Sequence, residues 1–339
     1  MNPTPQHIAI VGAGLSGLSC AQALIATGHT VHLFEKSRGA SGRMSTRRGD
    51  DAGQPWQCDH GAQYFTASDP AFRAEVARWE AAGAAALWNA QIASFDGNHW
   101  SAPATPTERF VGTPRMTSPA ISMVQDLDAK LHLHLQTTVQ QVQRVPEGWM
   151  LTSTEHGPYS MRCDALLLAV PAPQVLPLLA DVSAAGTALA ASVRMRGSWA
   201  LMLRCAARVE LPFDGAFINA GPLRWMARDS SKPGRSGPET WLLHATPEWS
   251  EAHIEDDAAV VTAALLDAFA ALGGPAPDAA IATSAHRWRY ADTESALSLG
   301  SWWDAHAQLG LCGDWLNGGK VEGAWLSGRA LAQQVLAGA

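Results

Sequence analysis

Residues 7–35 read HIAIVGAGLSGLSCAQALIATGHTVHLFE, and this stretch decides the class of fold. The apolar run at 7–11 predicts a buried parallel strand, and small and apolar residues recur at helical spacing over 15–27. A second apolar run at 30–34 predicts the next strand. The stretch therefore predicts a βαβ unit of the Rossmann type.

Three glycines, Gly12, Gly14 and Gly17, form a GxGxxG turn between the predicted strand and helix. The first permits a tight turn, the second lets a pyrophosphate approach the backbone, and the third lets helix and strand pack closely. Glu35 ends the second strand, where a carboxylate accepts hydrogen bonds from ribose hydroxyls. The register of these parts favours dinucleotide binding over a glycine-rich turn without a ligand, but it does not separate FAD from NAD.

The composition is that of a globular chain of 339 residues, long enough for two domains. A net charge of −7 argues against nonspecific binding of nucleic acid. The five cysteines form no CxxC pair, which favours a reducing compartment. Neither a signal peptide nor an apolar run of the ~20 residues that span a bilayer is found. We expect a cytoplasmic protein without a membrane or nucleic-acid partner.

The rest of the chain predicts a discontinuous nucleotide-binding domain. Residues 36–66 are rich in Gly, Ser and Arg and predict an extended loop with a short helix, whereas 118–130 predicts a helix. Alternating strands from residue 131 lead into a buried strand that ends before Pro171. We expect residues 1–70, 131–175 and 281–339 to form the nucleotide-binding domain, and 71–130 and 176–280 to form a substrate domain of sheet and helices.

Two regions, one near the start of the chain and one in its tail, identify the cofactor through a resemblance. GRMSTR at 42–47, together with GDW at 313–315, EGA at 322–324 and SG at 327–328, resembles the flavin amine oxidase superfamily. The resemblance implies an α/β fold with a Rossmann-like FAD-binding domain and an inserted substrate domain. It also implies that Asp314 contacts the ribityl chain and that the backbone of 321–324 lies against the isoalloxazine ring.

The resemblance and the glycine turn together give a set of FAD-binding positions. Cys312 falls in a predicted strand, where its side chain belongs to the core, so we expect FAD to be held without a covalent bond. The expected FAD-binding residues are Gly12, Gly14, Leu15, Ser16, Gly17, Glu35, Lys36, Gly42, Arg43, Met44, His60, Gly61, Ala62, Val139, Gly313, Asp314, Lys320, Val321, Glu322, Gly323 and Ala324.

Three further segments narrow the resemblance. DHGAQYF at 59–65, VGTPRM at 111–116 and HRWRYA at 286–291 resemble the renalase family in its bacterial form. The resemblance covers most of the chain and is weakest over 180–235. It implies oxidation of 2- and 6-dihydro isomers of NAD(P)H, with NAD(P)⁺ as product and hydrogen peroxide formed when dioxygen reoxidises the flavin.

The expected catalytic residues have plain structural alternatives. A histidine in the apolar strand WLLHAT is also explained by a neighbour that satisfies it, an asparagine near Gly221-Pro222 by a turn, and the aromatic side chains by packing. The resemblance favours the role of ring-positioning groups. The candidates are His244, Asn219, Tyr64, Trp288 and Tyr290.

Other polar residues are interpreted more simply. His132 and His134 share one strand face without an evident third ligand, so we expect no metal site. Arg43, Arg47 and Arg48 follow Glu35 closely, which favours an anion-facing role for at least one of them over a solvated basic loop.

Two other functions stay open at this point. One is a flavin amine oxidase acting on a true amine or a porphyrinogen, and the other is a flavin-bound structural or sensory module. The sequence also leaves the chain open as a monomer or a homodimer.

Overall fold

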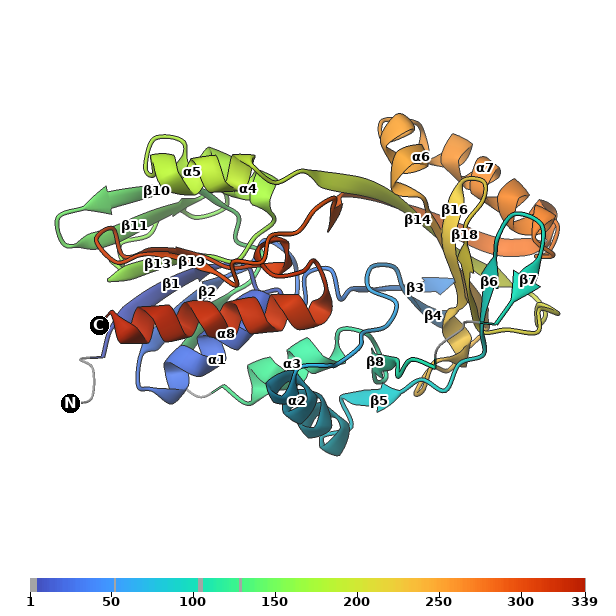
Figure 1. The fold of residues 1–339 in the computed structure, drawn as a ribbon, viewed down its shortest axis with the longest axis horizontal. Helices are drawn as coiled ribbons and strands as arrows, with labels where there is room; N and C mark the ends of the chain where they lie inside the picture. Colours follow the sequence, from blue (N-terminus) through green and yellow to red (C-terminus); the bar gives the residue numbers. More distant parts are fainter. Residues whose placement is uncertain (1–4, 52, 103–105, 128–129, 339) are drawn as a thin grey trace.

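The computed structural model describes residues 5–51, 53–102, 106–127 and 130–338. Two large sheets lie at opposite ends of the molecule (Figure 1). One is a six-stranded, mostly parallel sheet and the other is a seven-stranded, mostly antiparallel sheet. The expected α/β fold, with a Rossmann-like sheet and a separate substrate-domain sheet, is confirmed.

The six-stranded sheet has the order β19-β20-β13-β1-β2-β9. All neighbours pair in parallel except β19, which pairs antiparallel with β20 at one edge. Burial of both faces explains why its central strands read as unbroken apolar runs. The strands are β1 (His7–Val11), β2 (Thr30–Phe34), β9 (Leu131–His134), β13 (Ala165–Leu168), β19 (Trp302–Asp304) and β20 (Leu309–Leu311).

Helices and a small sheet cover the two faces of this sheet. Helices α1 (Leu15–Ala26), α3 (Ser118–Gln125) and α8 (Val321–Ala337) pack on one face (Figure 1). The other face is covered by a three-stranded antiparallel sheet and two helices. These are β10 (Val139–Val145), β11 (Gly148–Ser153), β12 (Gly157–Pro158), α4 (Ala172–Leu179) and α5 (Ala184–Ala191).

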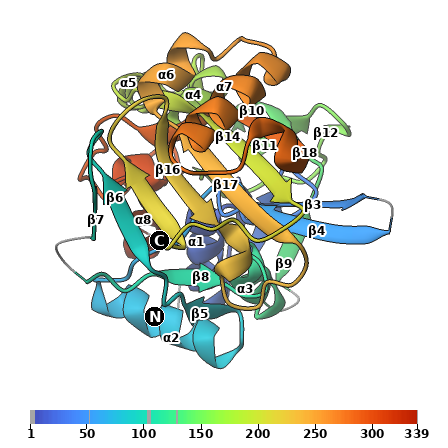
Figure 2. The ribbon, with the colours of Figure 1, turned by 90° about the vertical axis from the view of Figure 1, so that its right-hand side faces the viewer.

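The seven-stranded sheet has the order β18-β14-β17-β16-β15-β6-β7. Its neighbours pair antiparallel except β15 and β6. Helices α6 (Pro247–Ala252) and α7 (Ala258–Ala271) lie over one face, and the other face turns towards the nucleotide-binding unit (Figures 1 and 2). The strands are β6 (Ile92–Phe95), β7 (Trp100–Ser101), β14 (Met195–Cys205), β15 (Gly215–Ile218), β16 (Leu223–Arg228), β17 (Glu239–Ala245) and β18 (Ala280–Thr293).

A β-hairpin joins the two halves. Strands β3 (Thr46–Asp51) and β4 (Gln54–Asp59) pair antiparallel, and the hairpin projects beside the seven-stranded sheet (Figure 2). The expectation of a loop with a short helix over 36–66 is wrong for this part, because charged and amide side chains mask the strand pattern of a hairpin that is largely open to solvent. The smaller elements are α2 (Pro70–Ala81), β5 (Ala85–Leu87), β8 (Phe110–Gly112) and the short 3₁₀ turns η1 (Asp229–Ser231), η2 (Pro277–Ala279) and η3 (Asp314–Leu316).

Some segment ends differ from the expected ones. Helix α3 ends at Gln125 rather than Lys130, and residues 128–129 lie outside the described part of the chain. Strand β18 pairs with β14, although the expected boundary assigned 281 onward to the nucleotide-binding domain. The domain boundaries themselves stay a prediction. Across the described ranges, none of the helices combines the length and apolarity that a bilayer crossing needs.

Candidate functional site

The glycine turn leaves room at one position only. At Gly12 an added Cβ would lie 2.5 Å from the carbonyl oxygen of Ala169, and at Gly17 it would lie 2.0 Å from that of Gly12. At Gly14 the nearest atom would be the Cα of Gly42, 3.9 Å away. The first and third glycines are therefore required by packing, while the second faces open space. This arrangement fits the pyrophosphate of a dinucleotide.

The start of α1 supplies donors to the same space. Its N-cap is Gly14, which offers no side chain to the first free N–H groups of the helix. The hydroxyl of Ser16 is buried and has no hydrogen-bond partner among the described residues. Leu15, in contrast, packs into the core. An oxygen-rich ligand at this helix end would satisfy both kinds of donor.

Glu35 lies buried at the end of β2 and holds the turn in place. Its Oε2 accepts a hydrogen bond from the Ala13 N–H (2.9 Å), and its Oε1 accepts one from the Ser37 N–H (2.8 Å). Each carboxylate oxygen retains a further lone pair for ribose hydroxyls. Removing this side chain would therefore disturb the turn as well as the expected ribose contact.

Arg43 connects four distant segments. Its guanidinium forms an ion pair with the buried Asp314 and donates from Nη1 to the carbonyl oxygen of Ala291 (3.0 Å). Its own carbonyl oxygen accepts from the Ala62 N–H (2.9 Å), and an added Cβ at Gly61 would lie 2.0 Å from that oxygen. The expected FAD-binding residues at 42–44, 60–62 and 313–314 are thereby brought together.

The tail packs its backbone closely at two glycines. An added Cβ would lie 1.8 Å from the Asn317 carbonyl oxygen at Gly323, and 2.0 Å from the Ser16 carbonyl oxygen at Gly328. Helix α8 begins at Val321, so residues 321–324 form its first turn. This turn presents free N–H groups, as the resemblance requires.

Not every expected FAD residue points a side chain at this space. The carboxylate of Glu322 accepts from the N–H (2.7 Å) and hydroxyl (2.8 Å) of Ser68 and from the N–H of Asp69 (2.6 Å), so it faces the start of α2. Met44 is buried, and Val139, the first residue of β10, packs into the core. Lys36 and Lys320 are exposed.

The seven-stranded sheet presents one row of side chains to the nucleotide-binding unit. Residues directly opposite one another on neighbouring strands point to the same face of a sheet. Ala200 of this row packs with Cys58 of the hairpin, which identifies the face. In strand order from β18 to β6 the row is His286, Ala200, His244, Trp225, Phe217 and Ser94.

Two of the five expected catalytic residues converge on the backbone of His60. The Nε2–H of His244 and the Nε1–H of Trp288 both donate to the His60 carbonyl oxygen, at 3.2 and 2.8 Å. The rings of His60 and Trp288 stack with centroids 5.2 Å apart. His286 meets the His60 ring edge-on at 4.7 Å. The result is a compact cluster of imidazole and indole rings.

The histidines of this cluster are held neutral. Burial lowers the pKa of His244 to about 4. Burial, followed by His286 and Arg47, lowers the pKa of His60 to about 3. Burial and Arg47 lower the pKa of His286 to about 4. All three rings are therefore uncharged near neutral pH and are weak bases.

The other three candidates lie apart from the His60 carbonyl. Tyr64 packs against Trp225, the strand neighbour of His244, with centroids 5.6 Å apart. Asn219 is exposed just past β15 and donates from Nδ2 to the Ser94 hydroxyl (3.3 Å). Tyr290 packs against the core between the six-stranded sheet and β10–β11. The roles of these three residues stay a prediction.

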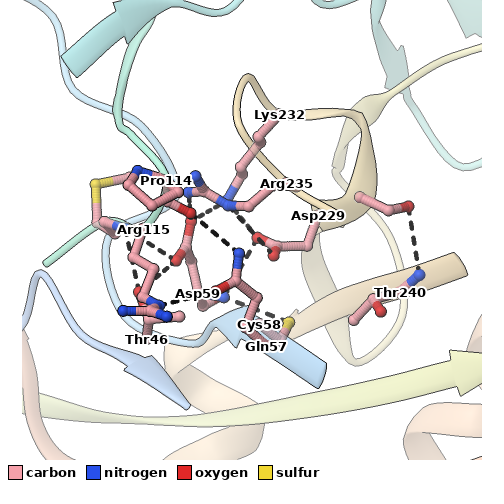
Figure 3. A network of polar contacts seen from close by, with 12 residues as sticks. Thr46, Gln57, Cys58, Asp59, Pro114, Arg115, Asp229, Lys232, Arg235 and Thr240 are labelled. Carbon is pink, nitrogen blue, oxygen red and sulfur yellow. Dashed lines mark hydrogen bonds and ion pairs between the residues drawn. The ribbon is translucent and has the colours of Figure 1, made fainter. Parts of the chain in front are cut away.

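A buried group of four charges anchors the His60 loop, and sequence reasoning missed it (Figure 3). Lys232 donates from Nζ to Asp59 (3.0 Å) and Asp229 (2.7 Å), and Arg235 donates to Asp59 (2.5 Å). Thr46 adds a hydrogen bond to the other oxygen of Asp59 (2.6 Å). Two acids and two bases balance, so the group is neutral as a whole.

In this group of four charges, attraction between opposite charges offsets the cost of burying them. Burial raises the pKa of Asp59, but Lys232 and Arg235 outweigh it and leave the pKa lowered. Burial lowers the pKa of Lys232, but the two carboxylates leave it raised. Asp59 directly precedes His60, so these contacts hold in place the His60 carbonyl oxygen, to which His244 and Trp288 donate.

Across the described ranges, no cluster of three or more His, Cys, Asp or Glu side chains has a metal-binding arrangement. The five cysteines are free and buried. Cys312 is fully buried in the core beside Cys20, as its strand position predicted.

Comparison with protein families identifies the chain. Residues 10–79 match the NAD(P)-binding Rossmann-like domain, and residues 93–336 match the family described as flavin containing amine oxidoreductase. The second match covers more than half of the chain. The chain belongs to the flavin containing amine oxidoreductase family. As a member of this family it is an FAD-dependent oxidoreductase.

Solved structures of two oxidases share the fold. A putative protoporphyrinogen oxidase from Exiguobacterium sp. 255-15 has a TM-score of 0.75 at 13% identity, with 98% of this chain and 99% of that chain covered. Cyclohexylamine oxidase from Brevibacterium oxydans IH-35A has a TM-score of 0.75 at 11% identity over the same shares. Identities this low show the fold alone.

Curated L-amino-acid oxidases match over a short stretch. The L-amino-acid oxidase of Trimeresurus stejnegeri is 51% identical over 49 residues, which is 14% of this chain and 10% of that protein. The L-amino acid oxidase of Cerastes cerastes is 53% identical over a stretch of the same length. These matches support the family and leave the substrate to be argued from the site.

Proposed function

We propose that this oxidoreductase is a renalase-like oxidase of dihydronicotinamides. Its substrates would be the 2- or 6-dihydro isomers of NAD(P)H, and its products NAD(P)⁺ and hydrogen peroxide. FAD, when bound, supplies N5 as the hydride acceptor and passes two electrons to dioxygen, which takes up two protons to give peroxide. The remaining task of the chain is to place the substrate ring.

One observation carries the proposal. The three segments that resemble renalase, at 59–65, 111–116 and 286–291, meet around Asp59 and His60. The Met116 N–H donates to Asp59 (3.2 Å), and Trp288 donates to the His60 carbonyl (2.8 Å). The resemblance beyond the generic FAD segments is therefore concentrated on one side of the site.

The electrostatics favour a dihydronicotinamide over an amine. An alkylammonium must lose a proton before oxidation, and a histidine with a pKa of 3 to 4 is a poor base for it. A dihydropyridine loses hydride without a coupled proton transfer. The pyridinium that forms would meet neutral imidazoles and the faces of Trp288 and Trp225, which attract a cation.

We further propose that FAD is held without a covalent bond and that the protein works in a reducing compartment such as the cytoplasm. The burial of Cys312 supports the first point, since this thiol is covered by core side chains. The free state of all five cysteines supports the second. Acid precipitation of purified holoprotein tests the first point and should release all the flavin as FAD.

Anaerobic stopped-flow mixing tests the proposed reaction. A 2- or 6-dihydro isomer should bleach the oxidised flavin much faster than any member of an amine panel, and admission of air should then produce peroxide. Faster bleaching by an amine or a porphyrinogen would assign the chain to that branch of the family. A flavin that none of these compounds reduces would favour a structural or sensory module.

Two variants test the ring-positioning residues. His244→Ala and Asn219→Ala should slow flavin reduction at saturating substrate while FAD stays bound, because a misplacement of ~1 Å costs on the order of 100-fold in rate. The exposed Asn219 side chain donates only to the Ser94 hydroxyl among the described residues, so Asn219→Ala disturbs few other contacts and is the sharper test. Wild-type rates in either variant would remove that residue from the site.

A further inference from the structure

Arg47 is a cation beside the ring cluster with no acidic partner among the described residues. Its Nη2 donates to the Nδ1 of His286 (3.2 Å), and its Nε is buried without a hydrogen-bond partner. The neighbouring arginines differ, because Arg43 pairs with Asp314 and Arg235 pairs with Asp59. A half-buried guanidinium next to uncharged imidazoles has unused donors and an unbalanced charge.

A second polar atom at the same place also lacks a partner. The Nδ1 atom of His60 is buried without a hydrogen-bond partner among the described residues, although His60 is only 5% exposed. His286 accepts the Arg47 hydrogen bond at Nδ1, so its neutral ring carries the proton on Nε2. Arg47, His60 and His286 therefore form a cluster of polar side chains with hydrogen-bonding capacity that the described residues do not use.

Strand β18 orders these residues along one direction. Ala291 binds Arg43 at the FAD side, Trp288 binds the His60 carbonyl, and His286 binds Arg47. His286 and Trp288 are two residues apart, which is roughly 7 Å along a strand. Along β18 the contact of His286 with Arg47 thus lies farther from the FAD side than the contact of Trp288 with His60.

We propose that Arg47, with His60 and His286, forms a subsite for the phosphate next to the ribose of the substrate. The inference rests on the proposed function and names the part of the dihydronicotinamide nucleotide that this site recognises. A guanidinium presents a planar fork of donors that matches a phosphate, and the neutral imidazoles add hydrogen bonds without adding charge. The buried carboxylates of Asp59 and Asp229 beside the His60 loop are bound to Lys232 and do not compete for Arg47.

Equilibrium binding to the oxidised holoenzyme tests the subsite without turnover. The probes are nicotinamide mononucleotide and nicotinamide riboside, which differ by this one phosphate, and the signal is the change in flavin absorbance. The wild type should bind the mononucleotide about 10- to 100-fold more tightly than the riboside, the range expected for hydrogen bonds to a charged group. Arg47→Ala should bring this ratio close to one, and Arg47→Lys should keep part of it.

Arg48 provides the matched control. It is exposed on the same strand, one residue further on, so Arg48→Ala should leave the ratio unchanged. Equal binding of the two probes by the wild type, or a ratio that Arg47→Ala does not alter, would overturn the subsite.

The failure of the subsite and that of the proposed function are separable. Reduction of the flavin by the dihydro riboside reports on the reaction alone, because this compound has no phosphate. If the riboside reduces the flavin and the binding ratio is one, only the subsite is wrong. If neither dihydro compound reduces the flavin but Arg47 still sets the ratio, only the proposed reaction is wrong.

Discussion

Trp288 and the backbone of His60 are joined by a 2.8 Å hydrogen bond from the indole Nε1–H to the carbonyl oxygen, across 228 residues of sequence. The same oxygen accepts from His244, so one carbonyl fixes two side chains of the substrate sheet relative to the loop at 60–62. The N–H of Ala62 in this loop donates to the Arg43 carbonyl oxygen, and Arg43 forms an ion pair with Asp314, an expected FAD-binding residue. The geometry of the ring cluster therefore depends on contacts between the two halves of the fold.

Trp288→Phe removes the indole donor and keeps an aromatic ring against His60. We expect flavin reduction by a dihydronicotinamide to slow by about 10-fold, because a lost hydrogen bond of this kind is worth about 1 kcal/mol and the ring can shift. FAD content should not change. Trp303→Phe is the control, because the Trp303 Nε1–H is buried without a partner and its loss should leave the rate as it was. An unchanged rate in Trp288→Phe would show that this hydrogen bond does not position the cluster.

Gly14→Val and Gly17→Val separate ligand binding from folding. A side chain at Gly14 enters open space, so Gly14→Val should give a folded protein without FAD. A side chain at Gly17 meets the Gly12 carbonyl at 2.0 Å, so Gly17→Val should fail to fold. The flavin-to-protein absorbance ratio and circular dichroism of the two variants check this. A yellow, stoichiometric Gly14→Val protein would mean that the pyrophosphate lies elsewhere.

The parts of the fold that follow from local pattern could be predicted. The strand, turn and helix at 7–35 and the tail at 313–328 contain their own signals, because apolar runs and glycines at a fixed spacing occur there within a few residues of one another. The hairpin β3–β4 could not be predicted, since its strands TRRGDD and QPWQCD are mostly polar. Its place is set instead by contacts such as that of Cys58 with Met202 on β14.

The arrangement of the candidate site could not be predicted from the sequence. The resemblance to a known family made His244 and Trp288 candidates, but nothing in the sequence indicates that both donate a hydrogen bond to the His60 carbonyl oxygen. Lys232 and Asp59 are 173 residues apart, so their ion pair has no local signal. The segment SKPGR around Lys232 has the composition of an ordinary solvated turn, and only the fold shows that the Lys232 side chain is buried.

Lys232→Met tests the buried group of four charges. The change leaves two carboxylates against Arg235 alone, and loss of one partner from a buried ion pair costs about 3–5 kcal/mol. We expect a clear fall in Tm, measured by thermal unfolding of the holoprotein. Adding Asp229→Asn to this variant restores neutrality and should recover part of the loss. A double variant less stable than Lys232→Met would contradict this electrostatic account.

Acid should destabilise the fold through its buried histidines. Burial, followed by the nearby His132, His134 and His7, lowers the pKa of His32 to about 4, and the three rings around His60 have pKa values of about 3 to 4. An unfolded histidine titrates near 6.5. Below this pH the unfolded chain binds more protons than the folded chain, so the stabilisation is fully present above pH 6.5 and is lost as the pH falls towards 4.

The free energy of unfolding should therefore decrease by at most about 5 kcal/mol per pH unit near pH 5, or about 1.4 for each histidine. Urea unfolding at several pH values measures this slope. His32 lies on the six-stranded sheet, away from the ring cluster, so His32→Asn should lower the slope by about one proton without changing FAD content. His306→Asn, at an exposed position, is the control and should keep the wild-type slope. If His32→Asn also keeps that slope, His32 is protonated equally in both states, and its burial beside His132 does not determine the acid sensitivity of the fold.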